Sequence, residues 1–193
     1  MRILVLLTTV LTIPLLQGCF GLAAVGAGAG VGTAVLVAED RRTVGAITED
    51  QEIELKARGR ISEQVKEAVH ISVTSYNRTV LLTGQAPSAE IKKQIEAIVA
   101  DMSNVRAIEN DIQIAAPSSL TSRANDSYLT SKVKARMLDS QQFQVNHVKV
   151  VTENNVVYLL GLVTRKEAEA AAEIARTTDG VQKVVKVFEY VTL

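Results

Sequence analysis

The spacing of apolar residues changes several times between positions 48 and 114, and each spacing predicts a different element. An apolar residue recurs at every fourth position at Ile53, Ala57 and Ile61, which predicts a helix with Thr48 as its cap. Apolar runs on either side of Asn77-Arg78 predict two strands joined by a short turn. A second helix is expected after Pro87-Ser88, and 105–114 is expected to form a third strand, with Ile108, Ile112 and Ile114 on one face.

The same order of patterns returns after a short stretch rich in Ala, Pro and Ser. We expect a helix capped by Asp126 or Ser127, two strands around Asn154-Asn155, a helix over Lys166–Arg176 and a last strand over 181–191. An offset of 77 pairs identical residues in the two halves: His70 with His147, Val73 with Val150, Asn77 with Asn154, Val80 with Val157, Leu82 with Leu159, Gly84 with Gly161, Glu90 with Glu167 and Glu96 with Glu173. One deletion in the turn between the second helix and the last strand then pairs Val105 with Val181.

This internal repeat predicts an α+β protein made of two tandem αββαβ domains. In each domain we expect a three-stranded mixed sheet with both helices on one of its faces, because each helix has one apolar stripe to bury. The predicted boundaries are 47–115 for the first domain, 116–124 for a linker and 125–193 for the second domain. In the last strand the outward residues Val185 and Val187 are apolar, so the two domains are expected to pack on each other or on a partner.

The N-terminal segment has the order of a secretory signal peptide. Met1-Arg2, an apolar run and Leu15-Leu16-Gln17-Gly18-Cys19 predict a signal peptide over 1–18. The last part resembles the bacterial lipobox, which implies that Cys19 becomes the lipidated first residue of the mature chain. The alternatives are an ordinary signal peptide or a membrane-spanning helix with a chance cysteine.

The next segment, 19–46, is interpreted as the lipidated cysteine followed by a flexible Gly/Ala tether. Residues 20–38 are uncharged and long enough to span a bilayer, but their glycines disfavour an isolated helix. A glycine-rich phosphate loop is disfavoured because no Lys-Ser/Thr pair follows and no strand precedes it.

Composition argues against several classes of function. The formal net charge is zero, with a slightly more basic second half, and no basic block or aromatic series indicates nucleic-acid binding. His70 and His147 hold equivalent positions in the repeat, which favours a structural role over catalysis. No paired cysteine or His-Glu-x-x-His spacing predicts a metal site. The protein is therefore expected not to be an enzyme and to need no cofactor beyond the lipid on Cys19.

Two αββαβ units with a glycine at the end of the second strand resemble BON domains. Together with the lipobox, the junction Asp40-Arg41-Arg42-Thr43-Val44-Gly45 and the stretch 150–164 are similar to those of dual BON-domain outer-membrane lipoproteins. The resemblance implies a periplasm-facing, lipid-anchored protein of the outer membrane that supports envelope integrity and can concentrate at the division septum. It also implies that the first helix of the second domain binds anionic phospholipid.

The residues of that helix can be judged directly. Leu129, Val133 and Met137 form the stripe that the sheet requires, and Tyr128, Ala135 and Leu138 lie off that stripe. Lys132, Lys134 and Arg136 are interleaved with them, and apolar groups beside cations are what a helix in a lipid interface needs. The resemblance implies that the aromatic ring at position 128 enters the lipid. The alternative is a solvated helix with an ordinary core stripe.

Two functions from different classes are therefore expected. The first is a lipoprotein that binds anionic phospholipid through this helix. The second is a periplasmic adaptor that docks on envelope assembly or division proteins or on a regulator of cell-wall enzymes.

Overall fold

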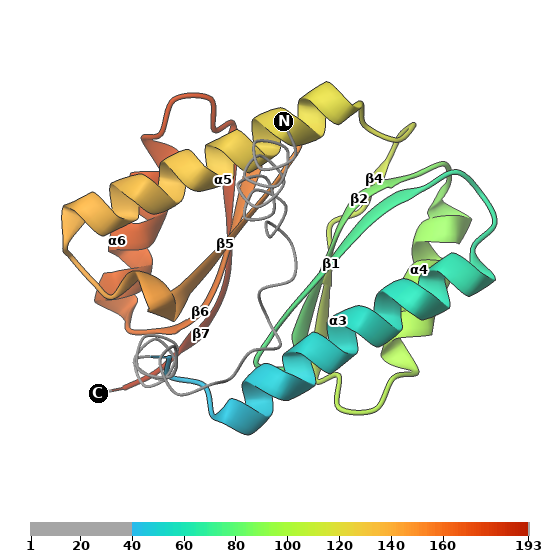
Figure 1. The fold of residues 1–193 in the computed structure, drawn as a ribbon, viewed down its shortest axis with the longest axis horizontal. Helices are drawn as coiled ribbons and strands as arrows, with labels where there is room; N and C mark the ends of the chain where they lie inside the picture. The colour runs from blue at the N-terminus through green and yellow to red at the C-terminus, as the bar shows by residue number, and fades with distance from the viewer. Residues whose placement is uncertain (1–39, 193) are drawn as a thin grey trace, which may run out of the picture. The chain divides into compact units, whose positions relative to one another are not determined.

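The computed structural model describes residues 40–192, and Cys19 and the predicted tether up to residue 39 lie outside this range. The first domain contains α3 (Val44–Gln64), β1 (His70–Tyr76), β2 (Thr79–Ala86), α4 (Ala89–Ala100), β3 (Ala107–Asn110) and β4 (Gln113–Ile114). β1 pairs with β2 antiparallel, and β3 and β4 both pair with β2 in parallel. Both helices cover the same face of this sheet (Figure 1).

The second domain repeats this arrangement. It contains α5 (Leu120–Ser140), the short 3-10 helix η2 (Val145–His147), β5 (Val148–Glu153), β6 (Val156–Val163), α6 (Arg165–Arg176) and β7 (Lys183–Tyr190). The strand order is β5-β6-β7, with an antiparallel and then a parallel pair. The predicted α+β class and tandem αββαβ units are confirmed. No helix among residues 40–192 combines the length and the apolar character that crossing a membrane requires.

A buried aspartate ties the first helix of each domain to the hairpin beside it. Asp50, which is 2% exposed, accepts hydrogen bonds from the N–H groups of Asn77 (2.7 Å) and Arg78 (2.8 Å). Asp126 accepts the equivalent bonds from Asn154 and Asn155, both at 2.9 Å. All four turn residues have positive φ, which Asn tolerates better than most residues. Each carboxylate therefore fixes the turn and the position of the helix at once.

Gly84 and Gly161 lie inside the second strand of each domain, two residues before its end and not at the end as predicted, and they permit a close approach of two backbones. A Cβ on Gly84 would lie 1.9 Å from the carbonyl oxygen of His70, and one on Gly161 would lie 2.3 Å from that of His147. Any side chain at either position would push the first strand away. The repeated pairs of His and Gly in the sequence therefore mark the same close contact between two antiparallel strands.

Several predicted boundaries are wrong. α3 begins at Val44 with Thr43 as its N-cap, not at Thr48. α5 begins at Leu120 with Ser119 as its cap, so it includes five residues that composition assigned to the linker 116–124, and Asp126 lies inside the helix rather than capping it. The first turn of α5 has no buried apolar residue and that of α3 has only the small Ala46, so the apolar spacing that marks each helix begins later.

The third strand of the first domain is also not the continuous strand that alternation predicts. It breaks between β3 and β4, where Ile112 turns into the core and Ile114 is left 60% exposed instead of sharing its face. The one-residue deletion between the repeats falls before the second helix, because the caps Ser88 and Thr164 are already 76 positions apart. Glu90 and Glu167 are therefore identical but not equivalent.

The helix-free faces of the two sheets share one apolar cluster. Tyr76 and Leu81 of the first domain and Tyr158 and Leu160 of the second are buried in it, and the outward Val185 and Val187 pack against it. Polar bonds surround the cluster: Gln85 donates to Glu153 (2.8 Å) and the Tyr158 hydroxyl donates to Asp111 (2.8 Å). Burial and this bond to Asp111 raise the pKa of Tyr158 above its usual range, so the phenol remains a donor.

The junction before α3 contacts both domains. Arg42 binds Asp50 (2.9 Å) and lies over the ring of Tyr76 in the first domain, while Arg41 binds Glu167 (2.7 Å) and the carbonyl of Leu162 in the second. Thr43, next in sequence, caps α3. The Asp40-Arg41-Arg42-Thr43 stretch is thus a cross-link between the two repeats.

Candidate functional site

The exposed side of α5 carries large apolar side chains in open solvent. Tyr128 is 64% and Leu138 is 67% exposed, and Leu120, which the sequence placed in the linker, is 79% exposed. The helical repeat of 3.6 residues brings these to one side of α5, and small exposed residues lie between them. We call this set the α5 outer face: Leu120, Ala124, Tyr128, Ser131, Ala135 and Leu138.

Arg136 has a different position from the one expected of a headgroup-binding cation. Its guanidinium donates to the carbonyl of Ile174 (2.9 Å) and to the hydroxyls of Thr178 (2.7 Å) and Thr177 (3.2 Å). These groups belong to the C-terminal end of α6, where unpaired carbonyls and the helix dipole attract a cation. Arg136 therefore holds α6 against α5.

The two lysines of α5 differ from each other in the contacts that they make. Lys132 donates to the backbone oxygen of Asp179 (3.1 Å) and lies 3.6 Å from its carboxylate. Lys134 is exposed, and no hydrogen bond or ion pair to it is recorded within residues 40–192. Of the three predicted cations, Lys134 is the one that remains available to an anion.

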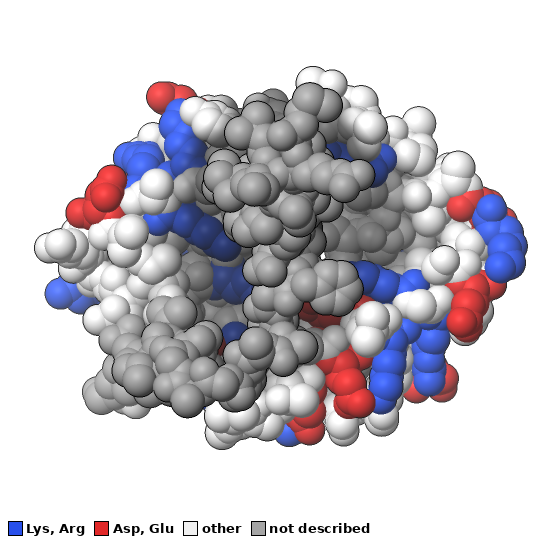
Figure 2. Space-filling view, viewed as in Figure 1, with Lys and Arg blue, Asp and Glu red and all other residues white. Residues whose placement is uncertain are grey.

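The equivalent helix of the first domain carries the same cations but neutralises them. An offset of 76 superposes Lys56, Arg58 and Arg60 on Lys132, Lys134 and Arg136. In α3, Lys56 pairs with Glu52 (3.3 Å), Arg58 with Glu54 (2.9 Å) and Arg60 with Asp101 (3.4 Å). Figure 2 shows acidic and basic side chains mixed over the part of the surface where α3 lies. In α5, Tyr128 and Thr130 replace the two glutamates.

The numbers of acidic and basic residues in the complete helices also distinguish α5 from α3. From Val44 to Gln64 there are five acidic and three basic residues, whereas from Leu120 to Ser140 there are two acidic and four basic residues. One of the two acids of α5 is Asp126, which is buried under the hairpin and does not contribute to the outer surface. The α5 surface is therefore cationic and partly apolar, and the α3 surface is acidic and ion-paired.

Sequence reasoning missed the roles of Asp50 and Asp126, although a signal was available. Both lie three residues before the first apolar residue of the stripe, at Ile53 and Leu129, and so on the buried side of their helices. An acid repeated on a buried side indicates a partner that both domains share. That partner is the pair of N–H groups in the asparagine turn.

The carboxylate that Arg41 contacts, that of Glu167, has a pKa far from its ordinary value. Burial would raise the pKa of Glu167, but hydrogen bonds from Arg41, Thr164 and His147 outweigh it and lower the pKa to about 2. Glu167 also completes the capping box of α6 with Thr164. No cluster of three His, Cys, Asp or Glu side chains that could hold a metal ion occurs in residues 40–192.

With this geometry established, the repeat can be assigned to a known class. The BON domain family matches residues 49–116 and 125–192, so each αββαβ unit is a BON domain and the chain belongs to this family.

Full-length relatives narrow the assignment. The outer membrane lipoprotein DolP of Haemophilus influenzae is 37% identical over 177 residues, covering 91% of this chain and 90% of the relative. The 21 kDa hemolysin of Actinobacillus pleuropneumoniae is 35% identical over 154 residues, 79% of each chain. The osmotically-inducible protein Y of Escherichia coli is 27% identical over 145 residues, covering 73% of this chain and 72% of the relative. The resemblance to dual BON-domain outer-membrane lipoproteins, the DolP family, is confirmed.

Proposed function

We propose that this protein is a periplasm-facing outer-membrane lipoprotein, anchored through Cys19, whose α5 outer face binds anionic phospholipid and so supports envelope integrity at the division septum. The relative named as an outer membrane lipoprotein supports the location. The relatives are BON-domain proteins rather than members of an enzyme family, which supports a binding role without catalysis, metal or cofactor.

One observation carries the lipid-binding proposal: the acids that neutralise the cations of α3 are replaced by Tyr128 and Thr130 in α5. A phenol ring and a leucine can enter the headgroup region while a neighbouring lysine meets phosphate. Each basic side chain near an anionic leaflet contributes about 1 kcal/mol. Affinity from α5 is therefore modest, so we assign residence at the membrane to the acyl chain and choice of lipid to α5.

The cations have unequal roles in this proposal. Lys134 meets the headgroup directly because no side chain or backbone group within residues 40–192 pairs with it. Lys132 exchanges its contact with the exposed Asp179 for lipid, and Arg136 keeps the ends of α5 and α6 together. Tyr128, Ala135 and Leu138 supply the apolar contact, with Leu120 extending it toward the N-terminal end of the helix.

The test is flotation of the mature chain carrying Cys19→Ala with vesicles of pure phosphatidylcholine or with added phosphatidylglycerol. Binding should require phosphatidylglycerol and should fall about 30-fold in Tyr128→Glu, which introduces the residue that α3 has at this position. The matched control is Leu55→Glu, an equally exposed apolar position of α3, which should bind like the parent chain. Equal losses of vesicle binding in both variants, or binding that does not depend on lipid charge, would contradict the proposal.

A further inference from the structure

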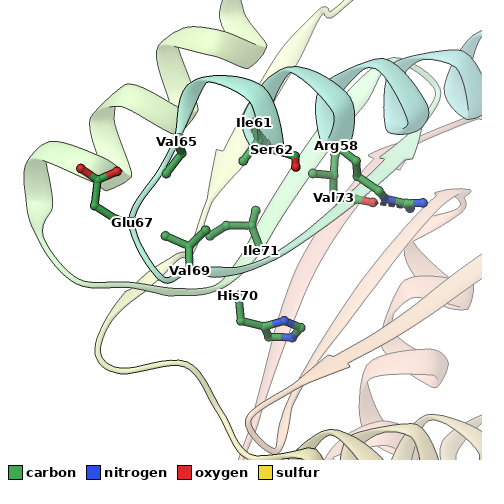
Figure 3. Close-up of a pocket in the computed structure, with 9 residues that line it drawn as sticks. All are labelled: Arg58, Ile61, Ser62, Val65, Glu67, Val69, His70, Ile71 and Val73. Atoms are coloured by element: carbon green, nitrogen blue, oxygen red, sulfur yellow. Dashed lines mark hydrogen bonds between the residues drawn. The ribbon is translucent and has the colours of Figure 1, made fainter.

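The first domain has an open groove between α3 and the free edge of β1. It has a volume of about 360 Å³ and is lined by Arg58, Ile61, Ser62, Val65, Glu67, Val69, His70, Ile71 and Val73. In Figure 3, Ile61 and Val65 project from the helix toward Val69 and Ile71, and the side chain of His70 points away from them. The groove thus has an apolar floor and one wall made of strand backbone.

Part of the β1 edge is already covered by side chains. Tyr76 and Thr79 flank the turn, so alternate residues 71, 73 and 75 turn their backbone groups away from β2. Arg58 donates to the carbonyl of Val73 (3.1 Å), and the N–H of Ser75 donates to Glu54 (2.9 Å). Lys149 donates to the carbonyl of Ser75 (3.2 Å). These contacts replace the hydrogen bonds that a neighbouring strand would make.

The part of the β1 edge that lines the groove lacks such side-chain hydrogen bonds among the described residues. Within residues 40–192, no side chain bonds to the N–H or C=O of Ile71 or to the N–H of Val73. These groups have the spacing with which a strand binds an added strand. Among residues 40–192, Arg58 donates from its Nη2 atom alone, to Glu54 and Val73, which leaves its other donors for an acidic group on an incoming chain.

The second domain fills the corresponding region with its own residues. Its connection between first helix and first strand contains η2, and Phe143 and Val145 from this connection pack against the domain core. In the first domain, the shorter connection has the exposed Lys66 and Glu67 at the corresponding place. The same fold therefore accepts an aromatic ring here, and the first domain does not supply one.

We propose that this groove binds an extended peptide segment that adds as a strand to β1. The segment places an apolar side chain between Ile61 and Ile71 and an acidic side chain beside Arg58. Its backbone pairs with Ile71 and with the N–H of Val73. This site goes beyond lipid binding, since it lies on the first domain and uses no residue of α5.

The test starts from a displayed library of random 12-residue peptides, panned on the mature chain carrying Cys19→Ala. Selected peptides should alternate apolar and polar residues and contain an acid. Titration of such a peptide into ¹⁵N-labelled protein should shift the Ile71 and Val73 amides most and slow their hydrogen exchange at least tenfold. A peptide N-methylated at alternate amides should bind at least tenfold more weakly, because it cannot complete the ladder.

Two variants decide whether the groove itself binds. Glu67→Phe, which introduces the aromatic residue of the second domain, should weaken binding at least tenfold. Glu63→Phe, an exposed position outside the groove, should leave it unchanged. The proposal is overturned if no peptide is enriched, if the shifts map elsewhere or if Glu67→Phe binds normally. It is also overturned if the chain forms a dimer that Glu67→Phe abolishes, since a second copy would then occupy the edge.

Discussion

α3 and α5 begin the two BON domains with the same length, the same buried aspartate and cations at the same three places, yet their surfaces differ. In α3 each cation has an acidic partner, and two of those partners lie one turn earlier on the same helix. In α5 those two positions hold Tyr128 and Thr130. The three shared cations would therefore not separate the helices. The difference lies in what each cation is already bound to.

The comparison also separates residues that hold the fold from residues that vary on it. The aspartate under the hairpin and the glycine at the close approach of the first two strands are present in both domains because the αββαβ geometry needs them. The outward residues of the first helix have no such constraint. Duplication of the domain therefore left one stable scaffold with two different surfaces.

The largest expected effect concerns what the two helices share. Asp50→Ala and Asp126→Ala each leave two turn N–H groups without a charged acceptor, which should lower the free energy of unfolding by about 3 kcal/mol. Asp50→Ala should cost more, because Asp50 also binds Arg42 and Ser75. Urea denaturation measures both. Asp139→Ala, an exposed acid of α5, is the control, and a loss there of equal size would contradict the assignment.

The next effect separates two cations of α5. Arg136→Ala should lower the free energy of unfolding by about 1–2 kcal/mol, because it removes hydrogen bonds at the end of α6. Lys134→Ala should leave stability unchanged and weaken binding to phosphatidylglycerol vesicles about fivefold. Thermal unfolding and flotation of the same two samples check this. If Lys134→Ala unfolds early and binds normally, the assignment is reversed.

A smaller effect, a gain in binding to anionic vesicles, is expected for a variant of α3. Glu52→Tyr removes the partner of Lys56 and installs the ring that α5 has at this place. We expect a gain of a few-fold in binding to anionic vesicles when it is made in the Tyr128→Glu background, where α5 no longer masks it. Glu52→Gln, which frees Lys56 without adding a ring, should gain less. No gain in either variant would show that the surrounding surface of the first domain also opposes lipid.

A further effect concerns the acid stability of the second domain. The pKa of Glu167 is lowered to about 2 from 4.5, so its stabilising contribution is complete above about pH 5 and is lost as the pH falls from 4.5 toward 2. Glu167→Gln should therefore be less stable at pH 7 and lose less stability than the parent on acidification. Urea titrations at pH 7, 5 and 3 measure the slope. Parallel slopes would mean that Arg41 and Thr164 do not hold this carboxylate.

The sequence was informative where local pattern and burial coincide. The repeat, the two asparagine turns and the glycines all recur at fixed offsets, and the architecture follows from them. The exposed state of Tyr128 and Leu138 also follows from their place off the apolar stripe. Apolar periodicity could not show the first turns of α3 and α5, because the small Ala46 is the one buried apolar residue that either turn contains.

Contacts between distant segments could not be predicted in this way. Arg136 carries the same charge as Lys134, and only the folded chain brings it to the end of α6. Beside the interruption at Ile112, Asp111 accepts a hydrogen bond from Tyr158 of the other domain, a contact that no local window contains. The sequence likewise identifies the Arg41-Arg42 pair as part of a motif, but only the folded chain shows that its partners are Glu167 and Asp50.

The position of that pair has a mechanical consequence. Any load that reaches the body through the N-terminal side of residue 40 meets Arg41 on the second domain and Arg42 on the first before it reaches α3. The load is therefore shared between the two domains and does not act on the first domain alone. The bidentate contact between Arg41 and the Glu167 carboxylate resists such a pull, because two parallel hydrogen bonds hold the same pair of groups.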